Sequence, residues 1–384
     1  MQTVFLALAG LVLLLAWCML TQGKRPSSAC PLRHNSCRVH SLLQLAPQAH
    51  GMAVPLSYQH GVYEVDLWVG GHPVRAVLDT GSERLIIAGD GCVRNSACTG
   101  AGGVYHTKPG HPRVESTTIA YGTQKDHVHW VTETLGLPAV STQNPCSLLW
   151  GEKASQKVEV EMEVGIVHHR EGDTNLNVMG FCPALGAPTN RTLLHVLLGD
   201  RPVFGLLLED KRGWLILGGG MSRCLPLQAV PLVSFRNYKY LMVKVQGVNI
   251  VDDTTGERRA CHPAPRYAIL DSGSNMLSVS TPLFQDMNLD PGRRHQVLEI
   301  DLGDGCVQTY HYPQYCMQQQ LLVRDNLPFA TEHQDDIILL GSLFMRQQYV
   351  EFDLGEKVVR FGKLSGRIET STPAPLPRTK KTYA

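Results

Sequence analysis

The chain has 384 residues, of which 35 are Lys or Arg and 34 are Asp or Glu, so its formal net charge near neutrality is +1. This balance excludes a general basic surface for nucleic acid, and the length exceeds that of one average domain. Short apolar runs that alternate with polar residues between Gly and Pro predict a mostly β protein.

The first segment is apolar. Residues 4–20 contain no charged residue, and small residues follow up to residue 23. The run is typical of a secretory signal peptide, predicted over residues 1–23, and the predicted location is the secretory pathway, either secreted or endolysosomal. The length of the run and the lack of Lys or Arg before it leave an uncleaved signal anchor open. Only in that case do we expect contact with a membrane.

A basic leader is predicted over residues 24–55. The stretch from Lys24 to His60 contains four Lys or Arg, four His and no Asp or Glu. Residues 61–70 then alternate with period two and predict a strand that leads into a hairpin at Gly70–Gly71. The next strand ends at Asp79.

The sequence that follows this strand occurs twice. Asp79-Thr80-Gly81-Ser82 recurs as Asp271-Ser272-Gly273-Ser274, 271 − 79 = 192 residues later, with apolar residues before both copies in the same register. An internal duplication at this distance predicts two lobes, over residues 56–230 and 231–365, divided near Pro231.

Each copy carries residues suited to holding a carboxylate in a tight loop. The apolar run predicts a buried strand with an Asp at its end. The hydroxyls of Thr80 and Ser272 can fix the turn through backbone hydrogen bonds. Gly81 and Gly273 allow the tight loop and leave room for a substrate backbone.

The two loops are expected to face each other. Asp79 and Asp271 would then share one proton, because two carboxylates at close range cannot both ionise. Ser82 and Ser274 are expected to donate hydroxyl hydrogen bonds to these carboxylates and to favour the ionised form.

Four further stretches accompany the duplication. They are Ile119–Thr123 with its Tyr-Gly, the apolar-apolar-Gly segments Val178–Gly180 and Leu339–Gly341, and the run Phe344–Asp353. Together with the two Asp loops they resemble the pepsin-like aspartic peptidases, from about Gly61 to Leu364. The resemblance implies an all-β, mainly antiparallel, bilobal acid protease fold with the active-site cleft between the lobes, and it implies neither a cofactor nor a metal.

The resemblance also assigns the site. It implies that Asp79 and Asp271 are catalytic. The substrate-binding residues would be Gly81, Gly273, Ser274 and the flap residues Tyr121, Gly122 and Thr123, with Thr80, Ser82 and Ser272 in support. One departure is that Glu83-Arg84-Leu85-Ile86 stands where Ser-Asn-Leu-Trp is usual. The Trp that normally supports the flap Tyr is therefore missing.

The leader and the cysteines are interpreted on the same basis. Residues 24–55 resemble a short prosegment that covers the cleft, and an unstructured basic leader is the alternative.

Ten cysteines remain once Cys18 leaves with the signal, which suits an oxidising compartment. Cys92 with Cys98 and Cys306 with Cys316 are close enough to close local loops, at places that resemble disulfide sites of the family. Pairings among Cys30, Cys37, Cys146, Cys182, Cys224 and Cys261 stay open, and some can be buried free thiols.

Three other features complete the chain. Asn190 begins an N-glycosylation sequon. His168-His169 is interpreted as a solvated pair with no third ligand nearby, so no metal site is predicted. Residues 366–384 are rich in Pro, Thr, Ser, Arg and Lys and predict a disordered tail.

These features predict an aspartic endopeptidase that acts on extended polypeptides. Apolar residues beside the scissile bond are expected, because Leu85 and Ile86 would offer no charge in the cleft. The optimum is expected to be mildly to moderately acidic, since sixteen His would add repelling positive charges at lower pH. Both Asp loops lie in one chain, so a monomer is expected.

There are two alternatives to peptidase activity. A pepsin-fold binding protein without catalysis stays open, because the fold does not guarantee the function. A carboxylate-pair glycosidase is disfavoured, because its two acids need no matched Asp-[Ser/Thr]-Gly loops.

Overall fold

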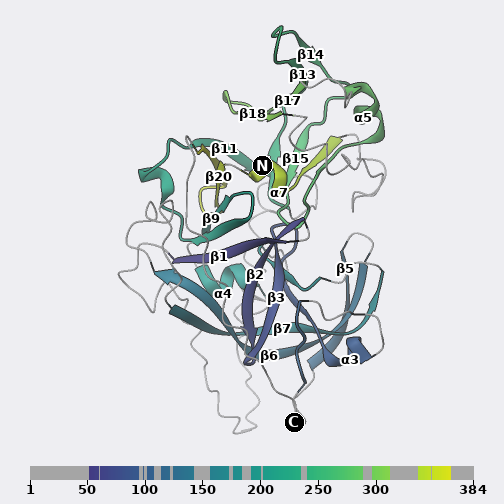
Figure 1. The fold of residues 1–384 in the computed structure, drawn as a ribbon, viewed down its shortest axis with the longest axis vertical. Helices are drawn as coiled ribbons and strands as arrows, with labels where there is room; N and C mark the ends of the chain where they lie inside the picture. Colours follow the sequence, from purple (N-terminus) through teal and green to yellow (C-terminus); the bar gives the residue numbers. More distant parts are fainter. Residues whose placement is uncertain are drawn as a thin grey trace, which may run out of the picture. The chain divides into compact units, whose positions relative to one another are not determined.

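The computed structural model of the chain (Figure 1) describes residues 52–59, 61–94, 98, 102–107, 114–121, 124–141, 156–172, 176–183, 192–199, 202–234, 240–288, 296–311, 336–346 and 348–364. The predicted signal peptide, residues 24–51 of the leader, Asn190 and the tail lie outside these ranges. In the part of the chain that is described, no helix is long and apolar enough to cross a membrane.

Residues up to Leu217 contribute ten strands and two short helices to the described part. The strands are β1 (Met52–Gln59), β2 (Val62–Val69), β3 (His72–Asp79), β4 (Leu85–Ala88), β5 (Val114–Tyr121), β6 (Gln124–Ser141), β7 (Gln156–Glu171), β8 (Val178–Gly180), β9 (Val203–Leu208) and β10 (Arg212–Leu217), and the helices are α3 (Asp90–Arg94) and α4 (Leu193–Leu198).

The remainder of the described chain begins with a 3-10 helix, η3 (Met221–Arg223). The strands that follow are β11 (Gln228–Val233), β12 (Met242–Lys244), β13 (Gly247–Asp252), β14 (Arg258–Ala260), β15 (Tyr267–Leu270), β16 (Leu277–Ser278), β17 (Gln296–Asp301), β18 (Val307–His311), β19 (Ile337–Leu340), β20 (Gln348–Asp353) and β21 (Val358–Lys363), with helices α5 (Thr281–Met287) and α7 (Ser342–Met345).

These strands form one seventeen-stranded sheet and a separate sheet of four, β14-β13-β17-β18. Most pairs are antiparallel, and the parallel ones are β3 with β8, β4 with β7 and β15 with β19. The predicted all-β, mainly antiparallel fold is therefore confirmed.

The two halves of the chain share the large sheet. Strand β20 pairs with β9 and also with β21, which places late strands beside early ones. Strand β11 pairs with β21 as far as Pro231 and with β12 from Leu232 onward. The predicted division near Pro231 thus falls where the pairing partner changes.

The N-terminal strands follow their hydrophobic pattern. Strands β2 and β3 form the predicted hairpin, with Val69 opposite His72. Along β2, Val65, Leu67 and Val69 are buried, whereas Asp66 and Trp68 between them are partly exposed. Strand β1 already begins at Met52 and pairs with β10, so the last four residues of the predicted leader range lie in the main sheet.

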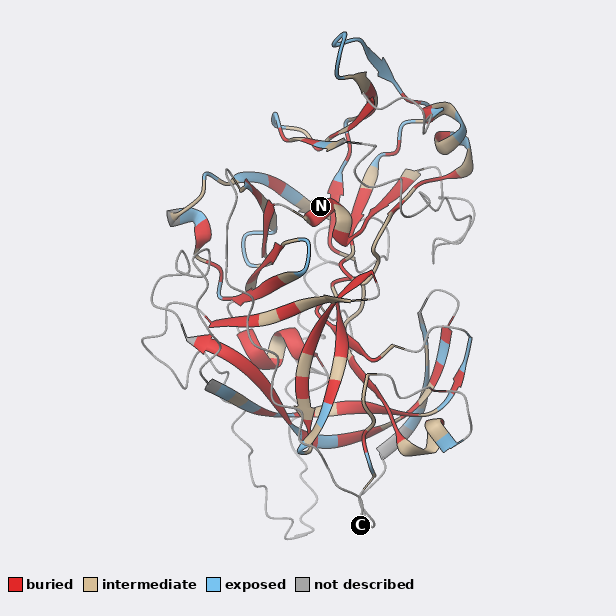
Figure 2. Cartoon of the chain, viewed as in Figure 1, coloured by how far each residue is buried: buried red, intermediate tan, exposed pale blue. Residues whose placement is uncertain are grey.

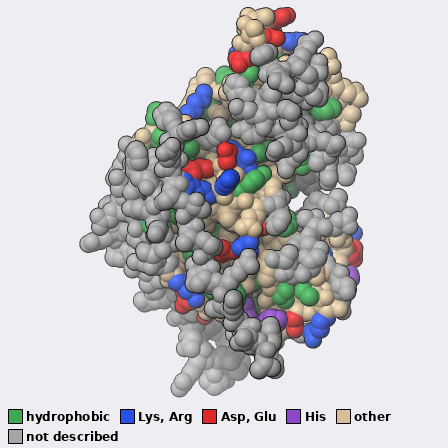
Figure 3. Space-filling model, in the orientation of Figure 1, with side chains coloured by type: hydrophobic (Ala, Val, Ile, Leu, Met, Phe, Trp, Pro, Cys, Tyr) green, Lys and Arg blue, Asp and Glu red, His purple; other side chains and the backbone are tan. Residues whose placement is uncertain are grey.

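Aromatic packing joins the two halves in the core. The ring of Phe204 on β9 stacks on that of Phe352 on β20, with centroids 4.8 Å apart, and Phe181 meets Phe204 edge-on at the same separation. Figure 2 shows the buried interior of the large sheet and the exposed strand β14. On the face drawn in Figure 3, the described acidic and basic side chains are interspersed.

Candidate active site

The two Asp loops are built in the same way. Strand β3 ends at Asp79 beside its parallel partner β8, and the N–H of Phe181 donates to the Asp79 carbonyl at 2.7 Å. Strand β15 lies beside its parallel partner β19, and the N–H of Asp271 donates to the Leu340 carbonyl at 3.0 Å. In both copies the chain that follows the loop forms a second, antiparallel neighbour of that partner strand. Strand β4 pairs with β8, and strand β16 pairs with β19.

Reciprocal hydrogen bonds connect the two loops. The Thr80 hydroxyl donates to the Leu270 carbonyl at 2.9 Å and accepts from the Ser272 N–H at 2.8 Å. The Ser272 hydroxyl donates to the Leu78 carbonyl at 2.7 Å and accepts from the Thr80 N–H at 3.0 Å. Both side chains are fully buried. Since neither hydroxyl has water as an alternative partner, these four bonds fix the position of one loop relative to the other.

The reciprocal bonds bring the two carboxyl groups together. The carboxyl groups of Asp79 and Asp271 lie close enough together for a hydrogen bond between them to contribute to the pKa of Asp271. Each loop also approaches the opposite carboxyl group so closely that only glycine fits. A methyl group on Gly81 would lie 2.8 Å from Cγ of Asp271, and one on Gly273 would overlap Oδ1 of Asp79. The sequence prediction that the two loops face each other agrees with this arrangement.

The site is electrostatically asymmetric. Removal from solvent raises the pKa of Asp271 well above its ordinary value, and the negative charge and hydrogen bond of Asp79 raise it further. Backbone N–H groups of Gly273 and Ser274 act in the opposite direction, and the Gly273 N–H lies 2.9 Å from Oδ1. On the other loop, the Gly81 N–H donates to Oδ1 of Asp79 at 2.8 Å. Burial and the neighbouring carboxylate therefore favour one proton on the pair at a pH where an isolated Asp would have lost it.

The serine hydroxyls differ from the sequence expectation. The Ser274 hydroxyl accepts a long bond, 3.5 Å, from the Met276 N–H. The Ser82 hydroxyl is buried and has no hydrogen-bond partner within the described ranges. The donors to the carboxylates are backbone N–H groups, because the turn at each glycine directs its own amide at the Asp side chain.

A pocket of about 380 Å³ lies beside the first loop. Its lining includes Gly81 to Arg84 from that loop, Thr118 to Ala120 from β5, Cys182 with Pro183 after β8, and Tyr240. Leu85 and Ile86 were expected in the cleft, but both are completely buried in the core. Leu85 packs in the main hydrophobic cluster with Leu78 and Met179, and Ile86 packs in a separate cluster with Trp130 and Val178.

Strands β5 and β6 form the hairpin predicted as the flap. Tyr121 ends β5 opposite Gln124, the first residue of β6. Gly122 and Thr123 lie outside the described residues, and their substrate-binding role remains a prediction. The indole of Trp130, on β6, donates through Nε1–H to Oγ1 of Thr117 on β5 at 2.5 Å and packs in one buried cluster with Ile86. Sequence reasoning missed this residue.

The structure shows which of the described cysteines are in disulfides and which are thiols. Cys92 and Cys98 form the predicted disulfide. Cys224 is also in a disulfide. Cys182, Cys261 and Cys306 are buried thiols. Cys316, the predicted partner of Cys306, is outside the described ranges, so a disulfide between them stays a prediction.

One of these thiols lies next to the two Asp loops. Cys182 follows Phe181, and its N–H donates to the Ser82 carbonyl at 2.8 Å. Burial raises the pKa of the Cys182 thiol, and the charges of Asp79, Glu83 and Asp271 raise it further. The thiol is therefore held neutral, and only its position after the Val-Met-Gly segment could have indicated its proximity to the site.

Comparisons with known proteins agree with this geometry. Residues 63–299, more than half of the chain, match the family described as eukaryotic aspartyl protease. The chain is also similar to gastricsin from Rattus norvegicus, at 21% identity over 341 residues that cover 79% of this chain and 81% of the relative. With its all-β fold and its two matched Asp loops, the chain belongs to the eukaryotic aspartyl protease family.

Proposed function

We propose that the protein is an active aspartic endopeptidase and that Asp79 and Asp271 are its catalytic pair. The observation that carries this proposal is the close approach of the two matched loops, in which the glycine of each loop lies against the carboxyl group of the other. The raised pKa of Asp271 supports a state with one proton on the pair, which is the state that acid–base catalysis by two carboxyl groups requires.

The reaction follows from this protonation state. A water molecule between the carboxyl groups gives a proton to the ionised Asp79, and its oxygen forms a bond to the scissile carbonyl carbon. Protonated Asp271 donates to the carbonyl oxygen and stabilises the negative charge that develops there. The tetrahedral intermediate then collapses. The C–N bond breaks as Asp79 passes the proton that it took from water to the amine nitrogen. Asp271 recovers its proton from the intermediate as the C=O bond forms again, so the pair holds one proton as before.

The substrate is an extended polypeptide strand. The flap residues Tyr121, Gly122 and Thr123 would close over it and exclude water, and Gly81, Gly273 and Ser274 would contact its backbone. A preference for apolar side chains rests on Ile119, Ala120, Pro183 and Tyr240 in the pocket lining, in place of Leu85 and Ile86. Glu83 and Arg84 also line the pocket, and their ion pair at 3.1 Å balances their charges.

The disulfide Cys92–Cys98 supports a protein of the secretory pathway, either secreted or endolysosomal, because such bonds persist in oxidising compartments. Both Asp loops come from one chain, which supports a monomer as the active form. A mildly to moderately acidic optimum is consistent with a proton held on Asp271 above the ordinary range of an Asp.

The test is turnover of a mixed peptide library by the purified protein and by two variants, Asp79→Asn and Asp271→Asn. Asn has the volume of Asp but cannot share the proton, so each variant should lose activity by at least about a hundredfold while remaining folded. Near-normal turnover by either variant would refute the assignment. A folded parent protein that binds peptides but cleaves none would favour the alternative, a catalytically inactive pepsin-fold binding protein.

A further inference from the structure

A group of histidines lies on strands β6 and β7, outside the catalytic site. His127 on β6 is directly opposite His169 on β7, and Glu171 lies two residues further along the same face of β7. The register shifts between His127 and Val128, which leaves His168 as the additional residue of a bulge. The sequence interpretation that no third ligand lies near His168-His169 is therefore wrong, because the pairing brings His127 to it.

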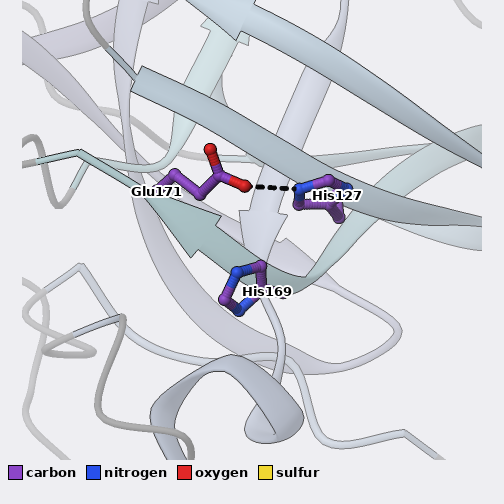
Figure 4. A group of neighbouring side chains, drawn as sticks. All are labelled: His127, His169 and Glu171. Carbon is purple, nitrogen blue, oxygen red and sulfur yellow. Dashed lines mark hydrogen bonds and ion pairs between the residues drawn. The ribbon is translucent and has the colours of Figure 1, made fainter.

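The side chains of His127, His169 and Glu171 converge (Figure 4), and one potential ligand atom from each lies within 4.8 Å of the others. His127 Nε2 and Glu171 Oε1 are 3.3 Å apart. Two ligands bound to tetrahedral Zn²⁺ at about 2.0–2.1 Å are separated by about 3.3–3.4 Å, which is the same spacing. Two imidazoles and one carboxylate are ligands that favour Zn²⁺ over Mg²⁺ or Ca²⁺.

We propose that His127, His169 and Glu171 form a binding site for a divalent transition-metal ion, with Zn²⁺ as the best match, on the outer face of β6 and β7. The three residues supply three ligands, and the fourth position of a tetrahedral ion would face solvent, because His169 and Glu171 are exposed. None of the three residues lines the pocket beside the Asp79 loop, and the proposal does not depend on peptidase activity.

Neighbouring residues hold the ligands in place. Oγ1 of Thr118, on β5, lies 3.1 Å from Nδ1 of His127. If Nδ1 carries the proton and donates to this hydroxyl, Nε2 is left to bind a metal. Metal-binding histidines usually adopt this arrangement, in which the other ring nitrogen donates to a hydrogen-bond partner. On the opposite face of the same strands, Asp126 and Arg170 form a buried two-point ion pair at 2.7 and 2.8 Å. This pair fixes the register that brings His127 to His169.

Two features oppose metal binding, the charge of Lys125 and the ion pair between His127 and Glu171. Lys125 is opposite Glu171 in the register, on the same face, and its positive charge disfavours a cation. Without a metal, His127 and Glu171 form an ion pair of their own, but an exposed pair of this kind contributes little to stability. Loss of Glu171 should therefore change metal affinity much more than it changes the melting temperature.

The experiment uses the untagged, full secreted protein at neutral pH and titrates it with Zn²⁺ in a calorimeter, with Co²⁺ absorption as a second probe. We expect one site that is lost in the double variant His127→Gln/His169→Gln. In Glu171→Gln we expect the Zn²⁺ affinity to be at least about tenfold lower. Loss of a residue that only supports a metal ligand already costs about this much, and Glu171 would be a ligand itself. Mg²⁺ should not compete, and Lys125→Gln should bind Zn²⁺ more tightly than the parent protein.

Matched controls separate this site from general histidine and carboxylate binding. His106→Gln removes another exposed imidazole, and Glu161→Gln removes another exposed carboxylate from β7, so both should bind Zn²⁺ like the parent. The proposal is overturned if the His127→Gln/His169→Gln variant binds Zn²⁺ as tightly as the parent, or if the parent gives no tetrahedral Co²⁺ spectrum. Circular dichroism of each variant shows whether it is folded.

Discussion

The guanidinium carbon of Arg84 lies 5.3 Å from the centroid of the Trp130 ring. Arg84 follows the Asp79 loop and lines the pocket, whereas Trp130 belongs to β6 and donates a hydrogen bond to Thr117 on β5. The indole therefore connects the Asp79 loop with the predicted flap hairpin. Ile86 stands where the family usually has Trp, and Trp130 packs in one cluster with it from β6, on the other side of β7.

This arrangement predicts the outcome of restoring the usual residue. Ile86→Trp should destabilise the protein by about 1–3 kcal/mol, because Ile86 is completely buried in a cluster already filled by Trp130. The measurement is urea unfolding of the parent, Ile86→Trp and the milder control Ile86→Val. Equal or higher stability of Ile86→Trp would show that Trp130 does not occupy the space of the missing side chain.

The reciprocal bonds between the loops predict a second effect. Thr80→Ala leaves the Ser272 N–H and the Leu270 carbonyl buried without this partner, at a cost of about 1–3 kcal/mol each. We expect lower stability and reduced turnover together, since the same bonds position the dyad. Thr80→Ser retains the hydroxyl and should restore most of both, so a Ser variant as damaged as the Ala variant would contradict this explanation.

The buried ion pair between Asp126 on β6 and Arg170 on β7 predicts a third effect. Asp126→Asn leaves the charge of Arg170 buried and less well compensated, which should destabilise the protein by about 3–5 kcal/mol. Replacement of both residues by Leu should cost less than the single change, because no unpaired charge remains. Glu159→Gln, in the exposed pair with Lys157 on β7, is the matched control and should change unfolding little. If Asp126→Asn does not lower the stability of the protein, this explanation of the ion pair is refuted.

Sequence and structure agree best where chemistry is encoded locally. The Asp-[Ser/Thr]-Gly repeat contains the carboxylate, the hydroxyl and the glycine of each loop, so the dyad and the roles of Thr80 and Ser272 could be predicted. Trp130, the Asp126–Arg170 pair and the contact of His127 with His169 could not. Each depends on the order and register of β4, β6 and β7, and the bulge at His168 interrupts the period-two pattern of β7 from which a register would be predicted.

The raised pKa of Asp271 predicts how pH affects activity. As pH rises through this pKa, the pair loses its single proton and the carbonyl oxygen loses its donor, so activity should fall. At low pH the second carboxyl group becomes protonated and the base is lost. Initial rates on a peptide library should therefore follow a bell on the acid side of neutrality, and a maximum at or above neutral pH would contradict a shared proton.

The same pKa predicts a stability difference between the parent and Asp271→Asn. In the unfolded chain Asp271 has an ordinary pKa, and in the folded protein the value is higher, so folding favours its protonated form. That contribution is fully present below about pH 4 and is lost as pH rises through the folded pKa, where a buried charge must form. Asn stays neutral at every pH. The variant should therefore be more stable than the parent near neutral pH, and the difference should shrink in acid.

Melting temperatures of both proteins across the pH range measure this difference. The titration of the sixteen His and of the other carboxyl groups is common to both proteins and largely cancels when the two curves are subtracted. Asp66→Asn, which changes a partly exposed carboxylate on β2, is the control and should show no such pH-dependent gain in stability. If Asp271→Asn gains nothing near neutral pH, Asp271 does not hold the proton of the pair, and the roles assigned to the two carboxyl groups must be exchanged.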